Sequence, residues 1–390
     1  MNNPMMKKQL TYLSPDCFFD TDALVLQHLA KEYDITWVAL VTATGSRVSN
    51  DEVVETIAGE AGVKLILKKV YWRKFSVRQL WFALKLLREL KLLRSDLIYI
   101  EDVGDFFFYL FQPFFLKKRT TVYAVHDVMP HPEQPDLRSK LQATLFSITR
   151  WLLMTRAHYH IFSRTEYRKF RKLYPTKNAF YTRLLLKSFG TPADAYNTDG
   201  ASGPGSITTC CRLLFFGHIA WYKGLDLLIE AVESLVKEGC TNFSLTIAGQ
   251  GNYWSQCETL IRSNSHYDLR IRYIADDEIP ELFSTHHFIV LPYRDASQSG
   301  PQMISLRYSL PVIASDVDGL SDFVVHGETG FTFSTNSGQS LTECLRHCLA
   351  LNDNEYLLIR QQLNAWKDKH YSTEDTIARY TRFFNERMED

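Results

Sequence analysis

A polar loop followed by a proline forms the first candidate binding site of the 390-residue chain. The apolar run Phe288–Tyr293 predicts a buried strand. Pro301 then begins a helix, because the N–H that proline lacks would have no partner in a first turn. The backbone amides of that turn and the positive end of its dipole attract anions. A loop of small and polar residues leads into this phosphate-sized anion site: Ser297, Gln298, Ser299 and Gly300.

Lys223 provides a positive charge at a second point of the same half. It lies between a predicted strand, Leu213–Gly217, and a predicted helix, Leu225–Lys237. A lysine in such a loop is a point charge that can neutralise an anionic group. His218 follows the glycine that closes the strand. It can assist in binding the same anionic group only when it is protonated or acts as a neutral hydrogen-bond donor.

Two histidines and an aspartate follow a predicted strand, Thr121–Val125, in the N-terminal half. His126 and Asp127 come at the strand end, and His131 lies beyond a proline. A histidine in this position titrates near neutral pH and can donate to a hydroxyl or a phosphate oxygen. Helix capping or a purely structural role is the alternative for each. Glu101-Asp102 ends the neighbouring strand and offers two further carboxylates.

Short apolar runs alternating with helical segments must position these residues. In the N-terminal half the predicted strands are Gln9–Ser14, Ile35–Val41, Val63–Lys68, Leu97–Ile100, Thr121–Val125 and Tyr159–Phe162. This alternation predicts a parallel, doubly wound α/β sheet, which binds ligands beyond the carboxyl ends of its strands. Asp22 is expected to cap a helix beginning near Ala23, with ligand hydroxyl binding as the alternative. In the C-terminal half, Ile271–Ala275 is also expected to be a strand.

The chain length suits two domains of ordinary size. Residues 187–208 lose periodicity and are rich in Gly, Ser, Thr and Pro, so they are predicted to be the linker. The first domain then covers residues 1–186 and the second covers 209–370. Residues 371–390 form an amphipathic terminal helix.

Charge is distributed unevenly along the chain, although the formal net charge is zero. Residues 1–190 carry 29 Lys and Arg against 18 Asp and Glu, whereas residues 191–390 carry 15 against 26. A basic first half suits an anionic ligand or membrane surface, or is simply a solvated surface. Seven cysteines without a regular spacing favour a reducing compartment. No secretory signal or membrane-spanning run is visible, so we expect a cytoplasmic protein, and we expect no nucleic acid among its partners.

A basic amphipathic helix is predicted at Ser76–Arg94. Trp81 and several leucines follow its helical period, and Lys or Arg residues surround them. Such a helix, together with the aromatic run Phe106–Phe115, indicates peripheral contact with an anionic membrane. Ordinary packing against the sheet, with the basic residues in water, is the alternative.

The motif order LPY…SQSG…PVIAS…GL…V..G.TGF resembles the donor-site half of the family-4 glycosyltransferases of the GT-B fold. SQSG followed by PVIAS is similar to a variant subgroup found mostly in bacterial polysaccharide assembly. The resemblance covers most of residues 209–335. It implies two Rossmann-like domains facing across a cleft, with a C-terminal helix crossing back to the first domain.

The resemblance also implies an activity. The protein would be a retaining enzyme moving a hexose-type sugar from a UDP or GDP donor to a glycan or lipid-linked acceptor, in cell-surface polysaccharide synthesis. The leaving phosphate would take the acceptor proton, so no nucleophile, metal or further cofactor is expected. The implied catalytic residues are Lys223, His126 and Asp127, and the implied donor-binding residues are Gly217, His218, Tyr273, Ile274, Asp295, Gln298, Ser299 and Gly300.

Two acidic residues of the family pattern are absent. The positions of two glutamates that flank the donor loop hold Ala296 and Ile304 here. Asp295, Gln298 or Gln302 would have to take over part of their contacts with donor hydroxyls. Two alternatives remain open: a nucleotide-sugar epimerase of the same fold, which needs acid/base carboxylates, and a catalytically inactive binding subunit.

Overall fold

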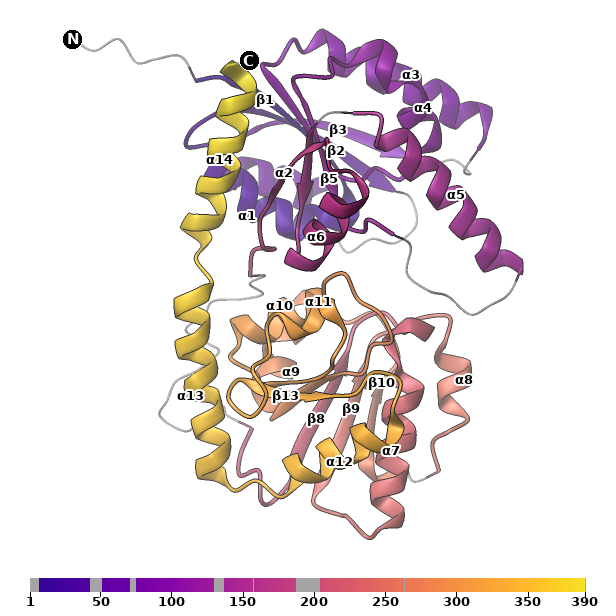
Figure 1. Ribbon diagram of the computed structural model, residues 1–390, viewed down its shortest axis with the longest axis vertical. Coiled ribbons are helices and arrows are strands. Elements are labelled where there is room, and N and C mark those ends of the chain that lie inside the picture. Colours follow the sequence, from indigo (N-terminus) through magenta and orange to yellow (C-terminus); the bar gives the residue numbers. More distant parts are fainter. Residues whose placement is uncertain are drawn as a thin grey trace, which may run out of the picture. The chain divides into compact units, whose positions relative to one another are not determined.

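The computed structural model describes residues 7–42, 51–70, 75–129, 137–156, 158–186, 204–262 and 264–389. These residues form two compact units, each built on one parallel sheet (Figure 1). The first unit holds the described residues up to Leu185 together with those after Ser372. The second holds the described residues from Leu186 to Ser372.

The first unit contains a seven-stranded sheet of order β3-β2-β1-β4-β5-β6-β7, in which neighbouring strands are parallel. Its strands are β1 (Gln9–Pro15), β2 (Asp34–Thr42), β3 (Lys64–Val70), β4 (Leu97–Ile100), β5 (Thr121–Val125), β6 (His158–Ile161) and β7 (Asn178–Tyr181). Its helices are α1 (Phe19–Leu29), α2 (Asp51–Ala61), α3 (Val77–Leu92), α4 (Phe106–Phe115), α5 (Leu137–Leu153), α6 (Arg164–Leu173) and α14 (Thr373–Glu389). The strand order reverses between β1 and β4, where doubly wound sheets bind ligands.

Side chains of this sheet alternate between two cores, one on each face. Tyr12 and Tyr99 pack into the core covered by α1, α2 and α14. Leu13 and Ile100 pack into the core covered by α3, α4, α5 and α6. Because both faces are covered, the strands read as continuous apolar runs in the sequence.

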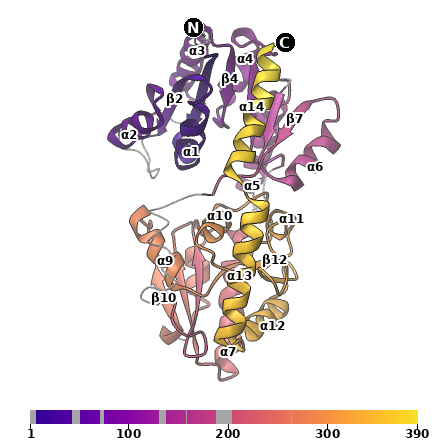
Figure 2. The same cartoon turned by 90° about the vertical axis from the view of Figure 1, so that its left-hand side faces the viewer.

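The last helix of the chain, α14, completes the first unit. Tyr380, Phe383 and Phe384 are buried in the core with α1 and α2, and α14 contacts β4 and β7 (Figure 2). Tyr33 donates a hydrogen bond of 3.0 Å to Asn385. The chain therefore returns to its first domain after the second, as the resemblance implied.

The second unit contains a six-stranded sheet of order β10-β9-β8-β11-β12-β13, again parallel. Its strands are β8 (Cys211–Phe216), β9 (Phe243–Ala248), β10 (Tyr267–Arg270), β11 (Phe288–Leu291), β12 (Val312–Ser315) and β13 (Gly330–Phe333). Its helices are α7 (Leu225–Lys237), α8 (Trp254–Glu258), α9 (Ile279–Thr285), α10 (Gly300–Arg307), α11 (Asp318–Ser321), α12 (Gly338–Leu349) and α13 (Asp353–His370). The switch in strand order falls between β8 and β11. The prediction of a doubly wound, parallel α/β architecture is thus confirmed for both units.

Two local predictions were wrong. Residues 271–275 are not a strand, since the backbone bends after β10, where the Arg272 amide donates to the Arg270 carbonyl at 2.9 Å, and Ile274 enters the core from a loop. Asp22 does not cap a helix, because α1 already begins at Phe19. The Asp22 carboxylate is buried and instead accepts a 2.8 Å hydrogen bond from Tyr12.

Some predicted features fall outside the described residues. They are His131 and residues 187–203 of the predicted linker. The remaining linker residues, 204–208, join the second unit, where the Ile207 amide donates to Asp353 at 2.8 Å. Among the helices that the structure describes, none combines the length and the apolar character needed to cross a bilayer.

Candidate active site

The loops after β8 and β11 meet at the switch point of the second sheet. The first carries Gly217 and a 3-10 turn, Trp221–Lys223, and the second ends in the Ser299 cap of α10. A Cβ added to Gly217 would lie 3.6 Å from Lys223 Nζ and 3.5 Å from Pro301 Cγ. The predicted cation and the predicted anion site therefore lie side by side within one unit.

Lys223 is buried beside an aromatic ring. Its side chain is 8% exposed, and its Nζ lies 5.2 Å from the centre of the Tyr293 ring. Burial lowers the pKa of Lys223 from its ordinary value. No carboxylate of the described residues pairs with this ammonium group. A buried cation without an acidic partner is stabilised by an anionic ligand.

The start of α10 has the geometry of an anion site. Ser299 precedes the helix, and its hydroxyl accepts a hydrogen bond from the Gln302 amide. Nothing lies within 4 Å of the Cβ position of Gly300, so the first turn is open there. The Tyr293 hydroxyl lies 3.5 Å from the Ser299 hydroxyl. Burial raises the pKa of Tyr293 to about 12, so this hydroxyl is neutral near pH 7.

Three glycines allow the loops of this site to approach one another. A Cβ at Gly249 would lie 1.9 Å from the Gly217 carbonyl oxygen, and one at Gly251 would lie 2.0 Å from that of Ile219. A Cβ at Gly224 would lie 1.9 Å from the carbonyl oxygen of the residue after β11, Pro292. The Gly-Gln-Gly run after β9 is thus explained by loop packing.

An ion pair that the sequence did not indicate joins the two loops. Arg294 donates two hydrogen bonds to Asp226, at 2.8 and 2.7 Å, and a third to the Trp221 carbonyl at 2.7 Å. The backbone amide of Arg294 also donates to the Tyr222 carbonyl at 2.6 Å. Arg294 and Asp226 therefore hold the turn that carries Lys223 against the loop that leads to α10.

The other predicted donor-binding residues lie on nearby loops with different degrees of exposure. The His218 side chain reaches the surface, yet partial desolvation and the charge of Lys223 lower its pKa, so we expect a neutral imidazole at pH 7. Tyr273 is 41% exposed, whereas Ile274 is in the core. Asp295 and Gln298 are half-buried in the loop before α10.

The two positions that hold glutamate in the family pattern are apolar and buried here. Ile304 packs into the core of the second unit, as does Ala296. A Cβ at Gly319 would lie 2.2 Å from the Ala296 carbonyl oxygen, so the donor loop is packed tightly against α11. Neither position can provide a hydroxyl-binding carboxylate.

In the first unit His126 is fixed by stacking and by a carboxylate. Its ring stacks between those of Phe18 and Phe162, with ring centres 4.3 Å apart on each side. Its Nε2 lies 2.8 Å from Glu101, which is buried and also accepts hydrogen bonds from Tyr12 and Tyr99. The sequence indicated Glu101 only as one of two loop carboxylates, and the stacking was not predicted.

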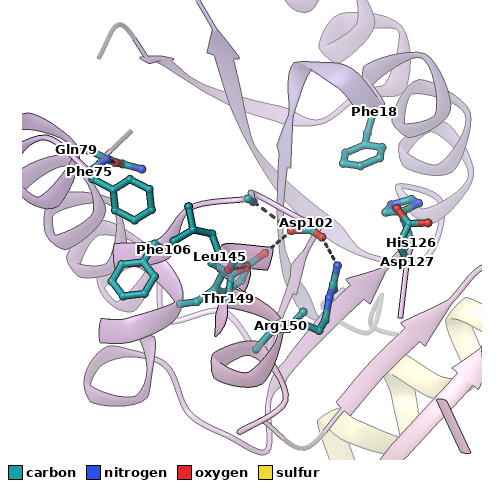
Figure 3. A pocket seen from close by; sticks show the side chains of 13 residues that line it. Phe18, Phe75, Gln79, Asp102, Phe106, His126, Asp127, Leu145, Thr149 and Arg150 are labelled. Atoms are coloured by element: carbon teal, nitrogen blue, oxygen red, sulfur yellow. Dashed lines mark hydrogen bonds and ion pairs between the residues drawn. The ribbon is translucent and has the colours of Figure 1, made fainter. Parts of the chain in front are cut away.

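A cavity of about 490 Å³ lies beside His126, within the first unit (Figure 3). His126 and Asp127, which follow β5, line it together. Asp102, after β4, accepts hydrogen bonds from Tyr109 at 2.7 Å and from Arg150 at 3.0 Å. The volume is within the range of about 300–1,000 Å³ usual for small-molecule sites.

Comparisons with solved structures identify the fold of both units. HepE from Anabaena, solved in complex with UDP and glucose, matches with a TM-score of 0.70 and 14% identity, covering 97% of this chain and 100% of that chain. WaaG, a glycosyltransferase involved in lipopolysaccharide biosynthesis, matches with a TM-score of 0.65 and 14% identity, covering 93% of this chain and 96% of that chain. The chain thus has the GT-B fold, two Rossmann-like α/β domains.

The family match concerns the second unit. Residues 210–351 match the model of the family described as glycosyl transferases group 1. A glycogen synthase from Thermodesulfovibrio yellowstonii is 24% identical over 174 residues, which are 44% of this chain and 34% of that protein. The chain therefore spans about one third of the length of this curated relative. The family match thus lies wholly within the second unit.

Proposed function

We propose that the protein is a retaining glycosyltransferase of the family-4 type, in the SQSG variant subgroup. It transfers a hexose-type sugar from a UDP or GDP donor to a glycan or lipid-linked acceptor, in cell-surface polysaccharide synthesis. One observation carries this proposal: the buried Lys223 ammonium lies beside Gly217 and the open first turn of α10. The complex of HepE with UDP and glucose supports a nucleotide-sugar donor.

The donor diphosphate lies against the amides at the start of α10 in this proposal. Lys223 Nζ neutralises the charge that develops as the bond between the sugar C1 and the phosphate oxygen breaks. The acceptor oxygen forms the new bond to C1 on the same face, and its proton passes to the leaving phosphate. No metal, nucleophile or further cofactor takes part. His126 and Asp127 bind substrate hydroxyls from the first unit.

The protein acts in the cytoplasm in this proposal, at the inner face of the membrane. Side chains of α3 and α4 support contact with a lipid surface, since Val77, Trp81 and Phe114 are 71%, 69% and 75% exposed. The basic side chains of Lys85 and Arg88 line a depression together with Trp81. Cations around an exposed tryptophan suit an anionic bilayer.

Replacing Lys223 by alanine tests the proposal. We expect the turnover of nucleotide-sugar hydrolysis to fall by about 10²-fold or more, because electrostatic stabilisation of a leaving group contributes several kcal/mol. The matched control is Lys237→Ala, since Lys237 is exposed at the end of α7. UDP-, GDP- and ADP-sugars are screened as donors. Near wild-type turnover of Lys223→Ala with every active donor would contradict the role of this lysine.

Calorimetric titration with UDP and GDP, combined with assays of donor hydrolysis and sugar transfer, separates the two alternative functions from this one. An inactive binding subunit would bind a nucleotide diphosphate and hydrolyse no donor. An epimerase would convert the nucleotide sugar without releasing the diphosphate. Transfer to an acceptor, with diphosphate release, is expected only of a glycosyltransferase.

A further inference from the structure

The cavity of the first unit has two chemically different halves (Figure 3). Phe75 and Phe106 lie together on one side with Leu145. His126 and Asp127 lie on the other side. The pair formed by Asp102 and Arg150 lies between these groups in the figure. A ligand that fills the whole cavity must therefore be amphipathic.

The aromatic half contains a residue with an energetically unfavourable backbone conformation. Phe75 is 49% exposed and has a φ of 62°, a left-handed conformation that is unfavourable for a residue with a side chain. Its amide donates to the side chain of Gln79, which in turn donates to Asp105 at 2.7 Å. Its ring lies 5.6 Å from that of Phe106. These contacts hold an exposed aromatic ring in a defined place, as apolar ligand sites require.

The described residues of the polar half carry no excess of positive charge. Among the described residues that line the cavity, Arg150 is the one with a permanent positive charge, and it forms an ion pair with Asp102. His126 faces the carboxylate of Glu101, and Asp127 is a further acidic residue of the lining. A phosphate group in this cavity would meet carboxylates, whereas sugar hydroxyls can donate to them.

We propose that the cavity binds an uncharged glycoside. The sugar ring lies against His126 and Asp127, and an apolar aglycone lies against Phe75 and Phe106. This inference rests on the proposed function and defines its acceptor as a sugar joined to an apolar group, with any phosphate outside the cavity.

Binding of short glycosides to the full-length protein tests the inference. The probes are the n-octyl and methyl glycosides of glucose, galactose and mannose, at concentrations below micelle formation, measured by calorimetry. At least one octyl glycoside is expected to bind about tenfold more tightly than its methyl counterpart, since burial of about two methylene groups provides that factor. Glucose 1-phosphate is expected to bind more weakly than the glucosides.

Three variants locate the binding. Phe75→Ala should remove most of the preference for octyl over methyl, whereas Phe114→Ala should keep it, because Phe114 is 75% exposed on α4 and does not line the cavity. Asp127→Asn should weaken the methyl and octyl forms by similar factors.

Several results would overturn the inference. They are equal affinity for all octyl and methyl pairs, an unchanged preference in Phe75→Ala, an equal loss in Phe114→Ala, and tighter binding of glucose 1-phosphate than of octyl glucoside. The titration with UDP and GDP tests the proposed function separately. Failure to bind either nucleotide would contradict the donor site and leave the octyl preference untouched.

Discussion

Substitutions at the ion pair between Asp226 and Arg294 should loosen the proposed donor site, although neither residue is expected to contact a substrate. The pair has two short hydrogen bonds, and the side chains of Arg294 and Asp226 are 12% and 17% exposed. Breaking a fully buried pair costs about 3–5 kcal/mol and an exposed pair about 0–1 kcal/mol. We therefore expect Asp226→Asn to reduce the free energy of unfolding by about 2–3 kcal/mol. For a domain of this size that corresponds to a fall in Tm of about 4–12 °C.

A double-mutant cycle with Asp226→Asn and Arg294→Gln isolates the pair from the other contacts of each residue. Urea unfolding should give a coupling energy of about 2 kcal/mol. Nucleotide diphosphate affinity should also fall in each single variant, because the turn that carries Lys223 is no longer held against the loop before α10.

The matched control is a pair of similar geometry at the surface. Arg346 donates to Glu238 at 3.0 and 2.8 Å, but these side chains are 47% and 42% exposed. Its coupling energy should be below about 1 kcal/mol. A coupling at Asp226 and Arg294 no larger than that of the surface pair would refute the reasoning, as would unchanged nucleotide affinity.

Four further outcomes are expected. Gly300→Val should weaken UDP or GDP binding in calorimetry with Tm nearly unchanged, because its Cβ position is open; equal affinities would exclude the anion site. Glu101→Gln should lower transfer at least about tenfold, since a hydrogen bond to a charged group contributes about 1.5–3 kcal/mol, while nucleotide affinity stays the same; unchanged transfer would show that holding His126 is not required. Trp81→Ala should reduce sedimentation with anionic vesicles at low salt, and wild-type protein that ignores such vesicles would contradict membrane contact. Burial lowers the pKa of His286 to about 4. The neutral imidazole therefore contributes fully to the stability of the fold above about pH 6.5, and this contribution is lost as the pH falls towards 4. Tm measured across this window should fall less in His286→Gln than in the wild type.

Local patterns in the sequence were sufficient for the architecture and for the loop junctions that carry the proposed donor site. Strands covered on both faces are apolar runs, so β4, β5 and β11 could be located without knowing their neighbours. The site residues Lys223 and Ser299 stand at strand–loop–helix junctions, which glycine and proline mark in the sequence. Helix α7 was predicted with the bounds that the structure shows.

Contacts between distant residues could not be predicted from the sequence. Asp226 and Arg294 are 68 residues apart, and each is one charge among many until β8 and β11 become neighbours. The stacking of His126 between Phe18 and Phe162 likewise depends on strand order. Residues 271–275 were wrongly expected to be a strand, because a loop that turns Ile274 into the core has the same apolar pattern as a short strand.

The place of α14 in the first unit has a consequence for biosynthesis. Tyr380, Phe383 and Phe384 fill a core whose other members, such as Tyr99, are translated much earlier. A ribosome adding about 5–20 residues per second needs roughly 10–40 s to make the intervening segment, residues 186–372. During that time the nascent first unit exposes an apolar face that a chaperone can recognise. Translation that stops before α14 leaves this face permanently uncovered. The exposed apolar face then distinguishes truncated chains from the folded protein, so proteases can degrade them selectively.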